Sequence, residues 1–259
     1  EIKTITSMDD KADKTDTVLN THLSRGRKAN TALGTGTFAF GYDVESTGSY
    51  THAEGYQTKA VGIGTGMHAE GKNTLANDDG AHAEGIGTIA SSDASHAEGL
   101  STNSSGEGSH AEGVRTNAVN GKGAHAEGYQ TRAEGSNGSH AEGADTRAAS
   151  NSSHAEGQST TASGEASQAE GYRVTASGQY SHAEGQKANN SAGRTYDGQN
   201  YYFGATGEAS HAEGVDAIAY GYGSHSEGYG TFVIGRAAHA EGSGTIAKGD
   251  FSHAEGGGT

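Results

Sequence analysis

Histidine and glutamate recur together along this 259-residue chain, two residues apart in the tetrapeptide His-Ala-Glu-Gly. Imidazole nitrogens and carboxylate oxygens are zinc and nickel ligands, and they also form ion pairs when the imidazole is protonated. Two variants keep the same phase, Gln168-Ala169-Glu170-Gly171 and His225-Ser226-Glu227-Gly228. The residues at the first and third positions of the repeats are His52, Glu54, His68, Glu70, His82, Glu84, His96, Glu98, His110, Glu112, His125, Glu127, His140, Glu142, His154, Glu156, Gln168, Glu170, His182, Glu184, His211, Glu213, His225, Glu227, His239, Glu241, His253 and Glu255.

The uniform spacing of these residues helps to decide between metal binding and ion pairing. A dedicated metal site gathers three or four ligands and their hydrogen-bonding partners at one place, whereas these pairs are spread evenly along the chain. The sequence therefore favours structural pairing between each glutamate and an imidazole of the same or a neighbouring subunit, and we expect no metal and no cofactor. Arrayed metal binding, and a ladder exposed to solvent on a monomer, are the alternatives. Pairing would raise the histidine pKa values and burial would lower them, and the sequence does not choose between these signs.

The spacing of the tetrapeptides indicates the elements that hold these side chains. Successive copies start 14 to 16 residues apart, apart from one gap of 29 residues between His182 and His211, interpreted as two periods of 14 and 15 residues. A fainter copy, Phe38-Ala39-Phe40-Gly41, lies 14 residues before His52, so the repeats begin near residue 32. Each period contains two short extended segments that end in glycine-rich turns. Such a period fits one coil of a flattened β-solenoid, and fifteen or sixteen coils would make a rod roughly 70 Å long.

Composition determines what fills this solenoid. Leucine, isoleucine, valine and phenylalanine make up about a tenth of the chain, well below their share in an ordinary globular core. Because side chains alternate along a strand, the Ala of Ser-His-Ala-Glu-Gly faces the interior together with Ser and Gly, while His and Glu face outward. A core of such small residues buries little apolar area, so we expect the chain to associate with other copies of itself.

The repeat resembles a known family. Its 14-residue period, its five-residue strand ending in Gly and its second strand of the form x-Ala-x-Gly are similar to the head repeats of YadA-like trimeric autotransporter adhesins. Over residues 32–259 the resemblance implies a left-handed parallel β-roll that forms a homotrimer, with the first strand facing the three-fold axis. That strand reads Ser-Val-Ala-Ile-Gly in the adhesins, so rows of His and Glu would line the axis here. The His-Ala-Glu-Gly version, and residues 13–27, resemble tail-fibre proteins of phages and prophages of Gram-positive bacteria.

Residues 1–31 do not follow the 14-residue pattern of the repeats. Ser7-Met8-Asp9-Asp10 resembles the start of a capped helix, and a weak apolar seam follows it at helical spacing. This segment is predicted to be a short N-terminal stem, either a helix or a coiled coil, with an irregular connector as the alternative. The seam consists of Met8, Ala12, Thr15, Leu19 and His22.

The 29-residue gap holds the densest group of aromatic residues, four in the eight residues from 196 to 203. Aromatic rings beside Asp, Gln and Asn suit the recognition of carbohydrate or protein surfaces. The alternative is a degenerate coil whose rings pack on the roll or cap a looped-out turn. The candidate receptor-binding residues are Tyr196, Asp197, Asn200, Tyr201, Tyr202 and Phe203.

The net charge and the absence of certain motifs argue against several classes of function. The net charge of −15 disfavours nucleic acid and anionic membranes as partners, and no apolar run is long enough for membrane insertion. Motifs for a catalytic nucleophile or a phosphate loop are also missing, so we expect no enzyme. The expected function is a structural and adhesive trimeric fibre segment, extracellular in the tail of a phage or prophage virion, that contacts a glycan or protein receptor on the bacterial surface. The alternative is the head of a bacterial trimeric surface adhesin, set second because no signal peptide opens the chain, and a metal-binding solenoid ranks third.

Overall fold

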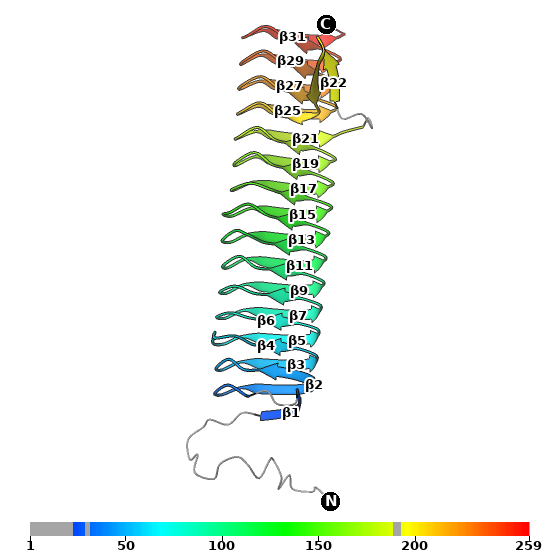
Figure 1. Ribbon diagram of the computed structural model, residues 1–259. Coiled ribbons are helices and arrows are strands. Elements are labelled where there is room, and N and C mark those ends of the chain that lie inside the picture. The colour runs from blue at the N-terminus through cyan, green and yellow to red at the C-terminus, as the bar shows by residue number, and fades with distance from the viewer. Residues whose placement is uncertain (1–22, 29–31, 189–192, 259) are drawn as a thin grey trace, which may run out of the picture.

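The chain folds as an all-β parallel solenoid of about fifteen coils (Figure 1). The structure, a computed structural model, describes residues 23–28, 32–188 and 193–258, and these residues include no helix. Each coil contributes one long strand, and the long strands stack into one continuous sheet. They are β2 (Phe38–Ser46), β3 (His52–Tyr56), β5 (His68–Lys72), β7 (His82–Ile86), β9 (His96–Leu100), β11 (His110–Val114), β13 (His125–Tyr129), β15 (His140–Ala144), β17 (His154–Gln158), β19 (Gln168–Tyr172), β21 (His182–Gln186), β25 (His211–Val215), β27 (His225–Tyr229), β29 (His239–Ser243) and β31 (His253–Gly257).

A second sheet is built from two-residue strands, one in nearly every coil. Both sheets pair in parallel and in register, so that each residue lies beside its counterpart in the next coil, as His96 lies beside His110. The last residues of β2 also join this second sheet. The short strands are β4 (Lys59–Ala60), β6 (Leu75–Ala76), β8 (Ile89–Ala90), β10 (Asn103–Ser104), β12 (Asn117–Ala118), β14 (Arg132–Ala133), β16 (Arg147–Ala148), β18 (Thr161–Ala162), β20 (Thr175–Ala176), β24 (Gly204–Ala205), β26 (Ile218–Ala219), β28 (Phe232–Val233) and β30 (Ile246–Ala247).

The core between the two sheets is thin and made of small side chains, as the sequence predicted. The alanines of both strands, such as Ala111 and Ala118, are fully buried along the rod. A threonine row that begins with Thr58 is buried in the turn between them. In one coil Ser226 replaces the first alanine, and its hydroxyl lies 2.7 Å from the hydroxyl of Thr231. The alanine and threonine rows therefore face each other across the core in direct contact.

Glycine at the fourth position of the long strand is required by the close stacking of coils. Gly99 has a φ of 113°, a conformation that side chains with a Cβ rarely adopt. A Cβ atom at Gly99 would also overlap the carbonyl oxygen of Gly113 in the next coil. The same relation holds from coil to coil, which explains why the tetrapeptide ends in glycine.

The interpretation of the 29-residue gap as two coils is wrong. Strand β21 pairs directly with β25, so that His182 lies beside His211, and the gap is a single coil with an insertion. The inserted residues include the antiparallel hairpin of β22 (Gly193–Tyr196) and β23 (Gln199–Tyr202). The chain leaves the coil after Lys187 and re-enters it at Phe203, in the place where other coils have the buried threonine. An insertion at a turn leaves the ladder of hydrogen bonds on both sides uninterrupted.

The predicted N-terminal stem falls mainly outside the described residues. Of residues 1–31, the structure describes 23–28, and there strand β1 (Leu23–Arg27) pairs in parallel with β2. The long-strand sheet thus begins with β1, whereas the sequence predicted that the repeats begin near residue 32.

Candidate functional site

The outer face of the long-strand sheet, here called the long-strand face, carries the histidines as one stacked row. From His52 to His140, neighbouring ring centroids lie 4.6 to 5.0 Å apart, with interplanar angles of 21° or less. A second run extends from His182 to His239, with spacings of 4.7 to 4.8 Å. Gln168 interrupts the row between the two runs. In-register parallel pairing alone produces this arrangement, because equivalent side chains must stack at the coil spacing.

The glutamates form a second row beside the histidines and pair with them unevenly. The distance from Nε2 of His52 to Oε2 of Glu54 is 3.3 Å, and the equivalent distance at His140 is 3.9 Å. The side chains of both rows are roughly one-third to one-half exposed in this single chain. Among the described residues, three coils have no ion pair between the histidine and the glutamate of the same strand; they contain His182, His211 and His239.

The fifth residues of the long strands add an exposed apolar row. Tyr42 and Tyr56 stack with their ring centroids 5.0 Å apart, and several later coils also carry a large apolar side chain at this position. The row is interrupted by polar residues such as Lys72 and Gln158. Exposed apolar side chains gathered on one face are typical of an interaction site. The exposed members are Tyr42, Tyr56, Ile86, Leu100, Tyr129, Tyr172 and Tyr229.

For three histidines, burial gives the pKa shift a sign, which the sequence left open. The pKa values of His140, His211 and His239 are lowered, first by burial and then by the neighbouring imidazoles, against the opposing attraction of nearby glutamates. Stacked rings place like charges side by side when protonated, so protonation of one ring disfavours protonation of the next. These three imidazoles are therefore neutral at neutral pH.

The second run of histidines brings metal-ligating atoms together in three groups. In each group, one nitrogen or carboxylate oxygen per residue lies within 4.8 Å of the others. Nε2 of His211, His225 and His239 is buried and has no hydrogen-bond partner within the described parts of the chain. The groups are His211–Glu213–His225, His225–Glu227–His239 and Glu170–His182–Glu184.

The hairpin packs its aromatic side chains onto the rod. The ring of Tyr201 meets Phe232 at 5.0 Å and Tyr220 at 4.8 Å, and Tyr196 meets Phe232 at 6.2 Å. The hairpin thus covers the outer face of the short strands in the coils that follow it (Figure 1). Of the candidate receptor-binding residues, Tyr201 and Phe203 are buried and Tyr196 is half-buried. Those that remain exposed are Asp197, Asn200 and Tyr202.

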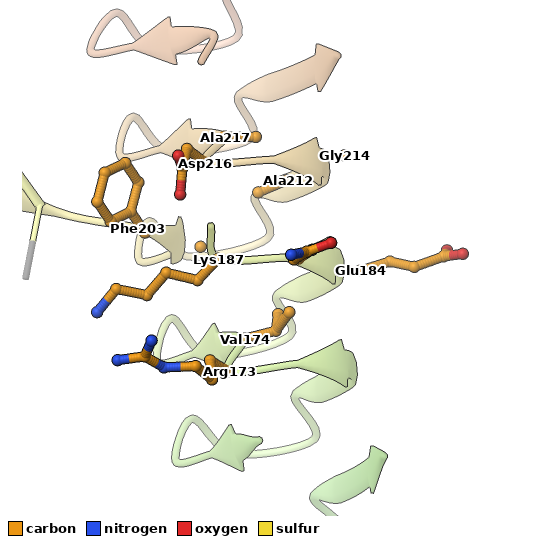
Figure 2. A pocket seen from close by; sticks show the side chains of 11 residues that line it. Arg173, Val174, Glu184, Lys187, Phe203, Ala212, Gly214, Asp216 and Ala217 are labelled. Atoms are coloured by element: carbon orange, nitrogen blue, oxygen red, sulfur yellow. The ribbon is translucent and has the colours of Figure 1, made fainter. Parts of the chain in front are cut away.

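At the root of the hairpin a small cavity of about 20 Å³ is lined by Phe203 and by charged side chains that include Arg173, Lys187 and Asp216 (Figure 2). Asp216 is buried there, and its carboxylate accepts a hydrogen bond from the backbone N–H of Ala188 at 2.9 Å. The ammonium group of Lys187 lies 5.9 Å from the Phe203 ring, and Arg173 precedes it in the row of turn residues. Asp216 therefore fixes the point where the insertion leaves the coil. Sequence reasoning missed this role, because threonine is also absent from the equivalent position at Val174 and Ala217, in coils without an insertion.

Comparisons with known proteins add no relative: no protein-family model matches this chain, and no match was found among curated proteins. Within the described ranges there is no helix of the length and hydropathy that crossing a bilayer demands.

Proposed function

We propose that this chain is a structural and adhesive fibre segment that forms a homotrimer through its long-strand face. The observation that carries the proposal is the exposed apolar row beside the histidine and glutamate rows, whose seven large members are spread along one face from Tyr42 to Tyr229. Burial of this row would supply the apolar area that the thin alanine core lacks. The resemblance of the repeats to trimeric adhesin heads supports three as the number of copies.

The repeat itself argues that the partner on this face is another copy of the chain. A partner that contacts every coil must present matching groups at the same spacing, about 4.8 Å, along the whole rod. An identical solenoid meets this requirement by construction, since all its rows are in register. A closed ring of three copies also leaves none of these faces open to further association.

We further propose that the trimer acts as a tail fibre or receptor-binding appendage of a phage or prophage, outside the cell. It would act by binding a glycan or protein on the bacterial surface and not by catalysis. The hairpin supports this, because Asp197, Asn200 and Tyr202 are exposed on it and no other described coil carries such an insertion. An exposed ring beside an amide and a carboxylate is suited to stacking on a sugar and hydrogen-bonding its hydroxyls.

Light scattering tests the trimer directly. The expected mass is three times the chain mass of 26.1 kDa. Leu100→Glu, which places a charge in the exposed apolar row, should shift the mass toward that of a monomer. Asn103→Glu is the matched control, because Asn103 lies in the same coil on the short strand β10. A monomeric wild-type protein, or equal effects of the two substitutions, would contradict an interface on the long-strand face.

Receptor binding is tested with labelled trimer on whole bacterial cells and on purified cell-wall glycans. The double variant Asn200→Ala with Tyr202→Ala should reduce binding about tenfold or more, as the loss of central contacts usually does. Tyr180→Ala is the control, since Tyr180 is about as exposed as Tyr202 but lies in a different coil. Unchanged binding by the double variant would remove the hairpin from the receptor site.

A further inference from the structure

We propose that His211, Glu213, His225, Glu227 and His239 form a binding site for one divalent transition-metal ion of the zinc class. The site goes beyond the proposed adhesive function, and all its ligands belong to a single chain. It lies on the long-strand face, in strands β25, β27 and β29. Two imidazoles and one carboxylate are a ligand set that zinc uses in proteins, with water in the fourth position.

The ligand atoms are close enough to converge on one ion by side-chain rotation alone. Within each of the two groups they lie within 4.8 Å of one another. Ligands 2.0–2.1 Å from a tetrahedral zinc ion are roughly 3.4 Å apart, so closure requires movements of about an ångström. The rings of His211, His225 and His239 are nearly parallel and 4.7 Å apart, and tilting about the soft Cβ–Cγ torsion brings neighbouring nitrogens together. The glutamate side chains adjust through their own torsions.

The imidazole nitrogens in this region have no hydrogen bond to give up. Nε2 of His211, His225 and His239 is buried without a hydrogen bond among the described residues, and so are several Nε2 atoms of the first run. What sets the second run apart is that carboxylate oxygens and two imidazole nitrogens lie within 4.8 Å of one another there, and the contact of His225 with its own Glu227 is long, at 4.0 Å. A buried nitrogen without a partner loses its interaction with water and gains nothing in return, and a metal ion would supply the missing interaction.

Charge also favours a cation at this position. Each group contributes one carboxylate, in a chain whose net charge is −15.

The two groups share His225, which limits the number of ions. An imidazole whose Nδ1 carries a proton has one lone pair, on Nε2, and can ligate only one ion through it. His225 can thus serve the group with His211 or the group with His239, but not both together. The structure predicts one tightly bound ion per chain in this region. The third group, Glu170–His182–Glu184, has a single imidazole and should bind zinc more weakly.

The sharing of His225 provides a distinctive test. Full-length protein is freed of metal with a chelator and titrated with Zn²⁺ by calorimetry, and bound Co²⁺ is followed by its visible absorption. His225→Gln removes a ligand from both groups and should weaken Zn²⁺ binding at least tenfold. His211→Gln and His239→Gln each leave one group intact and should change the affinity by about threefold or less. Glutamine is suitable because the coil at Gln168 already accepts it in register.

His96→Gln is the matched control, since it alters the same row in the first run and should leave the affinity unchanged. The proposal fails if no Zn²⁺ binds with a stoichiometry near one per chain. It also fails if His225→Gln binds like wild type, or if His96→Gln is equally damaging. The mass by light scattering, measured on the same samples, keeps the two proposals apart. A trimer without Zn²⁺ binding overturns the metal site alone, and a monomer that binds Zn²⁺ overturns the trimer alone.

Discussion

At the scale of single residues, two separate demands explain the alanine and the glycine of the repeated tetrapeptide. Alanine is small enough to lie between two closely spaced sheets, as at Ala111. Glycine permits a conformation and a close approach that a Cβ atom would prevent, as at Gly99. Neither demand applies to histidine and glutamate, because their side chains lie outside the core. Their regular spacing along the chain follows from the rows that they form on the long-strand face.

The glycine requirement predicts a difference between two substitutions by alanine. Gly99→Ala should destabilise the fold by about 3 kcal/mol or more, through both a forbidden φ and overlap with the next coil. Gly80→Ala should cost about 1 kcal/mol, because Gly80 has a φ of 61° and open space around its Cα. The turn position of Gly80 is held by alanine in another coil, at Ala94, with a φ of 51°. Urea unfolding of both variants measures the difference, and equal losses would contradict it.

The lowered histidine pKa values predict that acid weakens the fold. Folded values for His140, His211 and His239 lie below the unfolded value of about 6.5, because burial disfavours the charged ring. Between the two values the unfolded chain binds more protons. The free energy of unfolding is therefore highest above about pH 6.5, where these rings are neutral in both states. It decreases as the pH falls toward the pKa values of the folded state.

Urea unfolding of metal-free protein at pH 8, 7, 6 and 5 tests this sign. The free energy of unfolding should decrease toward pH 5. A triple variant with glutamine at His140, His211 and His239 should show a smaller decrease over the same range. Greater stability in acid would mean that pairing with glutamate outweighs burial.

At the scale of the elements, the hairpin of β22 and β23 is an insertion, and the coils that follow it carry residues suited to pack against it. The coils that follow it carry Ile218 and Phe232 on the outer face of the short strands, where the coils from Asn103 to Thr175 have polar or charged residues. These large residues pack under Tyr201 and are buried by it. The insertion and the composition of the following coils are thus parts of one small second core.

That second core predicts unequal effects of two neighbouring tyrosines. Tyr201→Ala removes a buried ring and uncovers Phe232, and should cost about 3 kcal/mol. Tyr202→Ala should change the stability by no more than about 0.5 kcal/mol, because the Tyr202 side chain is 58% exposed. Thermal unfolding of the two variants compares these losses. A larger loss for Tyr202→Ala would mean that the hairpin packs on the rod with its other side.

Sequence reasoning identified the coils and their faces but not the hairpin, and the reason is physical. In-register stacking makes every coil repeat its pattern, so the period and the alternation at Ala111 and Ala118 sufficed to place the core. A gap of 29 residues is numerically equal to two periods, and length alone cannot distinguish a coil from an insertion. The missed signal was Asp197-Gly198, a pair typical of tight hairpin turns, whose φ angles are 48° and 77°.

The candidate metal site was missed for a different reason. His96 and His211 have the same neighbours in sequence, Ser before and Ala-Glu-Gly after, so no pattern separates them. What separates them is the convergence of neighbouring side chains: His211, Glu213 and His225 bring ligand atoms within 4.8 Å of one another, whereas His96 belongs to no such group among the described residues. Side-chain geometry of this kind depends on the surrounding rows and is not encoded in a five-residue motif.

At the scale of the whole molecule, the rod is a stack in which each coil contacts mainly the coil before and the coil after it. Its stability is therefore close to a sum of nearly identical contributions, with few contacts between distant parts of the chain. This predicts that the number of coils is not critical for folding.

Removal of residues 96–109 tests this, because it deletes one complete period and joins Ser95 to His110, as Ser109 was joined before. The shortened chain should keep its β-sheet circular dichroism and melt within about 5 °C of wild type, or about 1–2 kcal/mol at this length. Removal of residues 96–102 alone should disrupt folding, since it places a short strand where a long one is required. Equal behaviour of the two deletions would contradict the stacking of the coils in register.

The uninterrupted pairing of β21 with β25 has a consequence for how such a molecule changes over generations. Duplication or loss of one period alters the reach of the rod, and insertion at a turn alters what the rod displays, and neither event disturbs the other. The length of the rod and the insertion that it carries can thus change independently of each other. A lineage can lengthen its rod while it keeps its hairpin, or exchange its hairpin at constant length.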